Sequence, residues 1–296
     1  MEWSTPHTRG FSLLILGLIN RGKAVGNAEG KHPYLLVGFS GEISTYWRIR
    51  MRTLYMIEIS PDLAALHRFL KMQGLGQSAE DIEFGYGIHA WLGAAFGKLA
   101  PKPWRLLVDK KRPPRLLGYS YYDESKLREY VSTFAEPLVF QVCRGGSNIV
   151  SKEMPLFQEG QSVGFEVVCC PVGRKAGSGI EKDIFLIAAD NADGRNIDRQ
   201  EIYCEWLTER LEQKGLSISH VELSDFRMAK QMRRTRRSNQ ERRIRYLRRP
   251  HALFKGVLTI DVPGAFQDLL ANGVGRHRAF GYGMVLLKPL PDYSTP

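Results

Sequence analysis

The chain has 296 residues, of which 43% are hydrophobic and 25% are charged, and its formal net charge at pH 7 is +11. That length can hold two ordinary domains with a substantial core, and the composition is that of a globular protein, which excludes a disordered one. The charge is local, because residues 227–249 contain ten arginines and one lysine against a single acid, Glu241, and so carry +10 of the total. A local excess of this kind favours a polyanionic partner over a general role in solubility.

The four cysteines form no CxxC pair, and no His/Cys cluster has the spacing of a zinc site. We therefore expect reduced and mostly buried thiols, no metal and no other cofactor, in a cytoplasmic protein. The apolar run from Phe11 to Asn20 is too short to span a membrane. It also lacks the basic start and the cleavage site of a signal peptide, so no membrane partner is expected.

After the first 50 residues the pattern of apolar residues becomes regular and predicts the order β-α-β-β-α-β. The predicted elements are a strand over 53–60, a helix over 61–74, a second helical stretch over 81–97, short strands over 104–108 and 115–120, a helix over 123–135 and a strand over 137–143. Pro61 suits the start of the first helix, Gly74 suits its end, and Asp123 is a suitable N-cap for the third. The two helical stretches before residue 104 count as one crossover.

The same order is predicted again in the second half of the chain. Its elements are a strand over 162–170, an amphipathic helix over 197–215, strands over 216–226 and 253–261, a helix over 263–273 and a strand over 280–289. The run 183–190 is left over and is interpreted as an extra strand. The arginine-rich segment falls between the two middle strands of this second unit.

These patterns predict an α+β protein made of two tandem ferredoxin-like (RRM-like) β-α-β-β-α-β domains. The predicted domains are residues 51–150 and residues 151–296, and residues 1–50 form an N-terminal extension to which the sequence assigns no role. The second domain carries the basic insertion at about 227–249 and a C-terminal glycine-rich loop at 273–283.

The basic insertion is predicted to be a helical finger that contacts RNA. A disordered charged tail is the simpler interpretation, but predicted strands flank the segment on both sides. Arginine forks match phosphates bidentately and stack on bases, so a structured RNA is the expected partner. The insertion supplies these predicted RNA-binding residues: Arg233, Arg234, Arg236, Arg237, Arg242, Arg243, Arg245, Arg248 and Arg249.

The glycine-rich loop reads "GVGRHRAFGYG" and leads into an apolar strand. Glycine permits positive φ, so a tight turn is one explanation of Gly273, Gly275, Gly281 and Gly283. Glycine also lets the backbone approach a phosphate, and the neighbouring cations Arg276, His277 and Arg278 suit that partner. Both interpretations remain open at the level of composition.

The order of these features resembles the CRISPR repeat-processing endoribonucleases of the repeat-associated protein (RAMP) superfamily, and its CasE-like branch in particular. Phe254 to Leu290, "FKGVLTIDVPGAFQDLLANGVGRHRAFGYGMVLLKPL", follows the closing segment of that branch, and "YGIHAWLGAAF" and "RQEIYCEWLTERLEQKG" look like its helices. The resemblance covers roughly Met51 to Leu290. The version of this branch found in type IV CRISPR systems is a candidate for the subtype.

The resemblance implies a metal-independent endoribonuclease. Such an enzyme would recognise the hairpin of CRISPR repeat RNA and cut the precursor transcript into mature crRNAs. It would leave a 2′,3′-cyclic phosphate and remain bound to its product. The glycine-rich loop would lie against the RNA, and other subunits of a CRISPR effector complex are further expected partners. The chemistry needs a group that takes the 2′ proton, a group that protonates the leaving oxygen and positive charge over the phosphorane.

His89 is the first choice for the proton transfer, because the family-like Tyr-x-x-His pattern places Tyr86 on the same helix face. Tyr86 would hold the imidazole or donate to the phosphate. The simpler interpretation of His89 is a half-buried histidine on a packed helix. His67 is the second choice, since it fits another family pattern but has Ala64 where a tyrosine would stand. Arg242 is the fallback for a site without histidine, an option that the type IV members keep open.

Two other functions compete with the endoribonuclease. A non-cleaving RNA hairpin-binding subunit, or scaffold of a CRISPR effector complex, would need the same charge and the same fold. A general RNA-binding protein built from two RRM-like units is disfavoured, because the stacking motif of RRM sheets is absent from the sequence. Incubation with labelled repeat RNA in EDTA distinguishes the enzyme from the scaffold.

Overall fold

A computed structural model gives the fold of the chain and describes residues 52–75, 84–109, 111–174, 180–192, 195–235 and 243–290. The predicted N-terminal extension, residues 1–50, lies outside the described residues. Within the described residues, no helix is long and apolar enough to cross a membrane.

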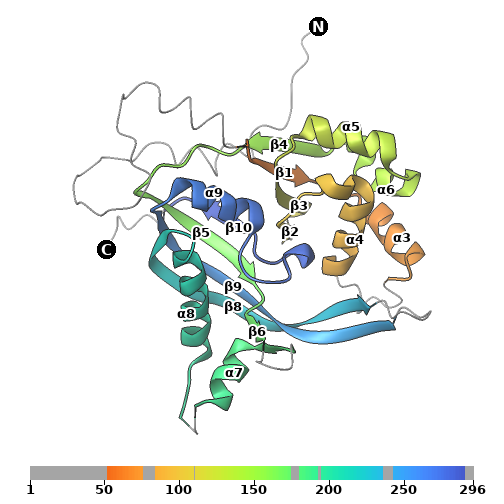
Figure 1. Cartoon of the computed structure of the whole chain (residues 1–296). Coiled ribbons are helices and arrows are strands. Elements are labelled where there is room, and N and C mark those ends of the chain that lie inside the picture. The colour runs from red at the N-terminus through yellow and green to blue at the C-terminus, as the bar shows by residue number, and fades with distance from the viewer. Residues whose placement is uncertain are drawn as a thin grey trace, which may run out of the picture.

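The first unit is a four-stranded antiparallel sheet with helices on it (Figure 1). Its elements are β1 (Tyr55–Ile59), α3 (Leu63–Met72), α4 (Phe84–Phe96), η3 (Gly97–Leu99), β2 (Trp104–Asp109), β3 (Arg112–Ser120), α5 (Glu124–Phe134), α6 (Pro137–Val142), η4 (Arg144–Gly146) and β4 (Ile149–Glu153). The strand order is β2-β3-β1-β4, which is the ferredoxin-like order. Asp62 and Asp123 begin α3 and α5 as N-caps, because their side chains accept from the amides of Ala65 and Lys126 at 2.9 Å.

The second unit repeats this topology with the strand order β10-β5-β9-β8. Its elements are β5 (Gln161–Cys169), β6 (Val172–Arg174), β7 (Glu181–Asp183), α7 (Ile184–Asp190), α8 (Arg199–Glu212), β8 (Leu216–Thr235), β9 (Arg243–Ile260), α9 (Pro263–Asn272), η5 (Arg278–Phe280) and β10 (Val285–Lys288). Helix α8 begins at the N-cap Asp198, whose side chain accepts from Gln200 N at 3.0 Å. The prediction of two tandem ferredoxin-like units is therefore confirmed.

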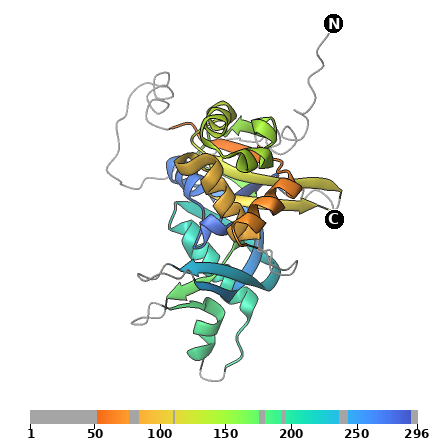
Figure 2. The ribbon, with the colours of Figure 1, turned by 90° about the vertical axis from the view of Figure 1, so that its right-hand side faces the viewer.

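The described residues of the arginine-rich insertion, 227–235 and 243–249, do not form the predicted helix. They extend strands β8 and β9 as one antiparallel ribbon, in register from Arg227 opposite His251 to Thr235 opposite Arg243. The strands flanking the insertion already set this pairing, so extension of the ladder pairs backbone groups that a helix would have to pair separately. Both views show the ribbon running below α4 and α3 of the first unit (Figures 1 and 2).

Two further predicted strands are helices. The run 137–143 forms α6, with Pro137 in the first turn where a missing N–H costs nothing, and β4 follows it. The run 183–190 forms α7, which Asp183 caps by accepting from Phe185 N at 2.9 Å. Short apolar runs do not distinguish strand from helix by periodicity; Pro137 in the first turn favours the helix in α6, and the Asp183 cap favours it in α7.

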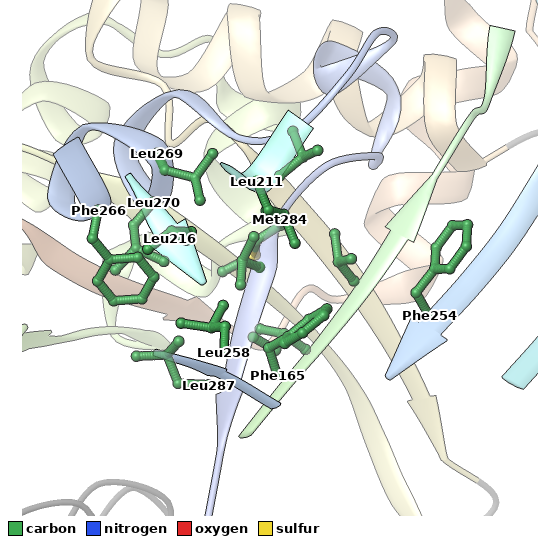
Figure 3. Close-up of a cluster of buried hydrophobic side chains, with 14 of the residues drawn as sticks. Phe165, Leu211, Leu216, Phe254, Leu258, Phe266, Leu269, Leu270, Met284 and Leu287 are labelled. Carbon is green, nitrogen blue, oxygen red and sulfur yellow. The ribbon is translucent and has the colours of Figure 1, made fainter. Parts of the chain in front are cut away.

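The two units share a hydrophobic core (Figure 3). Phe165, Phe254 and Leu258 of the second sheet pack with Phe266 and Leu269 of α9, and side chains of the first unit join the same cluster: Leu54, Leu117, Tyr119 and Met154.

Polar contacts cross the same junction. The Tyr119 hydroxyl donates to Val285 O at 2.8 Å, and Trp104 Nε1 donates to Ala279 O at 3.1 Å. Arg105 forms an ion pair with Glu166 at 2.6 Å. The glycine-rich loop is thereby held against β2 of the first unit.

Candidate nucleic-acid interface and active site

Helix α4 directs Tyr86 and His89 toward the glycine-rich loop. Its opposite face carries Ile88, Trp91 and Leu92, which are at most 2% exposed. Trp91 Nε1 also donates to Val139 O at 3.2 Å, which ties α4 to α6. The apolar spacing along α4 therefore fixes the rotation of the helix.

Phe280 of η5 brings the loop to this helix face. Its ring stacks on Tyr86 with the centroids 6.1 Å apart and the planes at 16°. The His89 ring meets Phe280 edge-on at 5.3 Å and 76°, and it lies 6.4 Å from the Tyr86 ring. The predicted pair Tyr86–His89 thus meets the predicted loop through an aromatic contact.

His89 has the protonation state that a general base requires. It reaches the surface of the molecule, yet partial burial lowers its pKa from 6.5, and the nearby positive charge of Lys102 lowers it further. At neutral pH the imidazole is therefore mainly uncharged and can accept a proton. Lys102 is exposed and adds a positive charge near this imidazole.

His67 lies apart from this constellation. It is exposed on α3, and α3 packs mainly against α6. The structure thus places His89, and not His67, next to the glycine-rich loop.

The four predicted loop glycines all have positive φ, between 72° and 88°. At Gly283 a Cβ atom would lie 2.2 Å from Val274 O, and at Gly273 it would lie 2.7 Å from Gly283 O. Trp206 and Trp104 close the space beside Gly275 and Gly281, because a Cβ atom at these positions would lie 3.1 and 3.0 Å from the nearest ring atom. The turn-forming role therefore accounts for these glycines directly.

The cations of the loop have partners inside the protein. Arg276 Nη1 lies 3.1 Å from Glu181 Oε1, and His277 Nε2 lies 3.1 Å from Glu181 Oε2. Arg249 of β9 contacts the same carboxylate at 3.0 Å and donates to Glu181 O at 3.1 Å. We call Glu181 with Arg249, Arg276 and His277 the Glu181 cluster.

The protonation states in the Glu181 cluster follow from burial and charge. Burial lowers the pKa of His277, and Glu181 opposes this only in part, so at pH 7 the neutral ring donates its Nε2–H to the carboxylate. Burial by itself would raise the pKa of Glu181, but His277, Arg249 and Arg276 outweigh it and lower that pKa. His277 also has φ of 62°, a left-handed conformation that costs a non-glycine residue about 1–2 kcal/mol.

The remaining predicted RNA-binding residues fall into three groups. Arg248 is exposed on β9, and Arg278 of η5 donates to the carbonyl oxygen of Asn272, the last residue of α9. Four residues are placed by their backbone on the paired strands of the ribbon, with 233 opposite 245: Arg233, Arg234, Arg243 and Arg245. Three lie outside the described residues: Arg236, Arg237 and Arg242.

Sequence patterns missed four residues of this region: Lys102, Glu181, Gln231 and Phe280. Phe280 was visible inside the glycine-rich loop, and an aromatic residue among cations is a recognisable signal for nucleic-acid contact. Glu181 lies far along the chain from Arg249, Arg276 and His277, so only the fold reveals that contact. No sequence pattern marks Lys102 or Gln231. Among the described residues, no group of three or more His, Cys, Asp or Glu side chains is placed to hold a metal ion.

Two ferredoxin-like units, a basic β-ribbon and a glycine-rich loop placed against a Tyr-x-x-His helix define a class of tandem ferredoxin-like proteins. The family model described as "CRISPR associated protein" matches residues 54–289, and the chain belongs to this family. A search among curated proteins found no match.

Solved structures share the fold. CRISPR endoribonuclease Cse3 bound to a 19 nt RNA is 19% identical with a TM-score of 0.52, and the match covers 80% of this chain and 100% of that chain. Thermus thermophilus Cse3 bound to an RNA representing a pre-cleavage complex is 18% identical with a TM-score of 0.53, at coverages of 80% and 100%. At these identities the likeness is one of fold.

Proposed function

We propose that this protein is a metal-independent endoribonuclease that recognises the hairpin of CRISPR repeat RNA and cuts the precursor into mature crRNAs. The observation that carries the proposal is the meeting of His89 and Tyr86 with Phe280 of the glycine-rich loop, in a chain of the CRISPR associated protein family. The Cse3 structures that share the fold contain RNA, which supports an RNA ligand here. The local charge of residues 227–249 supports the same ligand.

In this mechanism His89 takes the proton of the ribose 2′-hydroxyl next to the scissile phosphate. The 2′ oxygen then attacks phosphorus, and the bond to the 5′ oxygen breaks. The leaving 5′ oxygen takes a proton from water and His89 returns its proton to solvent, so the products end in a 2′,3′-cyclic phosphate and a 5′-hydroxyl. Lys102 supplies positive charge over the phosphorane, and Tyr86 is the neighbouring hydroxyl donor on the same helix face. Arginines of the β8–β9 ribbon hold the hairpin, and the cleaved product stays bound.

The test uses the full chain and a labelled repeat RNA in excess EDTA. We expect cleavage with a 2′,3′-cyclic phosphate end, and we expect replacement of the 2′-hydroxyl at the cut site by hydrogen to abolish cleavage while binding survives. A requirement for added Mg²⁺ would refute the mechanism. Tight binding without cleavage would instead make the protein a non-cleaving hairpin-binding subunit of an effector complex.

A further inference from the structure

The Glu181 cluster combines an excess of positive charge with an opening to solvent. Two arginines face one carboxylate, and His277 is mainly neutral at pH 7, so the cluster carries a net charge of about +1. Arg249, His277 and Glu181 have side chains only 11–16% exposed, whereas the side chain of Arg276 is 42% exposed. Arg276 is therefore the solvent-exposed member of an otherwise mostly buried cluster.

Two more buried donors lie on the same face of the β8–β9 ribbon. Arg249 is opposite Ala229 and Gln231 is opposite Leu247, so Arg249 and Gln231 are diagonal neighbours on one face. Taken as whole residues, Gln231 is 4% exposed and Arg249 is 9% exposed. Gln231 Nε2 and Arg249 Nε have no hydrogen-bond partner among the described residues. Buried donors of this kind are normally paired, so these two require an acceptor.

We propose that Arg249, Gln231, Arg276 and His277 form a binding site for a phosphate of the RNA, and that the Glu181 carboxylate is the internal anion that an RNA phosphate displaces. The proposal rests on the proposed function, because it takes RNA as the ligand. Apart from Glu181, the side chains of this site present donors: two guanidinium groups, an amide nitrogen and an imidazole N–H. Arginine forks and amide donors match the several acceptor oxygens of a phosphate better than the two oxygens of one carboxylate.

The position of the site fits this ligand. His277 and His89 both contact Phe280, with ring centroids 6.2 and 5.3 Å from it. A phosphate held by His277 would therefore lie near the residue proposed to act at the scissile phosphate, because the Phe280 ring contacts both histidines. Displacement of the Glu181 carboxylate from its cations would couple RNA binding to a shift of the paired strands β6 and β7, which pair from Val172 opposite Asp183 to Arg174 opposite Glu181.

The first test compares Glu181→Gln with the matched control Glu166→Gln in the full chain. Glu166 is also ion-paired and partly buried, but its partners are Arg105 and Lys288. Removing a competing negative charge should tighten hairpin RNA binding by E181Q roughly 5- to 50-fold at low salt, whereas E166Q should stay within about 2-fold of wild type. The slope of log K against log salt should steepen by about 0.7–0.9 for E181Q, as for one added phosphate contact. Binding by E181Q that equals or falls below that of E166Q overturns the proposal.

Inorganic phosphate separates a failure of this site from a failure of the proposed function. If wild-type protein does not bind the hairpin, the RNA ligand is wrong and the displacement proposal fails with it. The anion site is then tested with inorganic phosphate in the absence of RNA. Phosphate should raise the melting temperature of E181Q more than that of E166Q, and an equal effect would overturn the anion site.

Gln231→Leu tests the site without touching Glu181 and covers the case in which E181Q does not fold. Replacing a buried donor that has no partner should leave the melting temperature unchanged or raise it. If Gln231 donates to the phosphate, hairpin affinity should nevertheless fall roughly 10-fold. Unchanged affinity of Q231L overturns the role of Gln231 and, with a negative E181Q result, the site.

Discussion

Gly283→Ala tests whether the glycine-rich loop is built around positive φ and close backbone packing. Gly283 has φ of 77°, which costs an alanine about 1–2 kcal/mol, and its Cβ would lie 2.2 Å from Val274 O. Relief of that clash must move a backbone that makes two hydrogen bonds, Val274 N to Gly283 O at 2.9 Å and Gly283 N to Val168 O at 2.7 Å. With about 1 kcal/mol for each bond, the free energy of unfolding should fall by about 3–4 kcal/mol.

The chain offers a matched control in Gly93→Ala. Gly93 is exposed on α4, and a Cβ there would meet nothing within 4 Å. The same substitution should therefore stabilise the protein by about 0.5–1 kcal/mol, because alanine favours a helix interior. Chemical denaturation measures both variants, and G283A should melt roughly 6–15 °C below wild type. A loss of less than about 1 kcal/mol for G283A would refute the argument, since the loop would then relax at little cost.

Three functional predictions concern the proposed reaction. His89→Ala should slow single-turnover cleavage roughly 10²–10⁴-fold with little change in hairpin affinity, whereas His67→Ala should change neither; near-normal cleavage by H89A would move the base elsewhere. Since the proposed mechanism uses a neutral His89 as the base, the rate should rise with pH through a pKa held below 6.5 and level off above it. Lys102→Met removes one cause of that lowering, so rates measured from about pH 5 to pH 8 should show this rise at higher pH, and an unmoved profile would contradict the role of Lys102. Four arginines of the basic insertion are replaced together by glutamine: Arg233, Arg234, Arg236 and Arg237. This change should flatten the salt dependence of log K by up to about three units, and an unchanged slope would remove these arginines from the interface.

The fold was predictable where apolar spacing was long and the helix ends were marked. Helices α5 and α8 follow from their periodicity and from the capping residues Asp123 and Asp198. The failures came from short or overridden patterns. The apolar pattern of the six residues of α6 fits a buried strand as well as a helix, and only the position of Pro137 favours the helix. In the arginine-rich segment, helix propensity lost to the ladder that β8 and β9 had already begun.

The site was predictable in part for a similar reason. Tyr86 and His89 are three residues apart, so one helix face unites them, and the sequence contains that relation. The stacking of Phe280 on Tyr86 joins residues almost two hundred positions apart. The ion pairs of the Glu181 cluster likewise join β7 to β9 and to the glycine-rich loop. Such contacts depend on how the two sheets meet, which local patterns do not encode.

The shared core has a consequence for how the chain folds. Leu117 and Tyr119 belong to the first unit, but they pack into the cluster centred on the second sheet, and the Tyr119 hydroxyl is satisfied by Val285. A break at the proposed boundary near residue 150 would leave these groups facing water on one fragment and an unpaired carbonyl on the other. The boundary therefore separates two repeats of the same topology, but it does not separate two independently stable domains. The two ferredoxin-like units should unfold together in a single transition, and neither half should be stable when expressed alone.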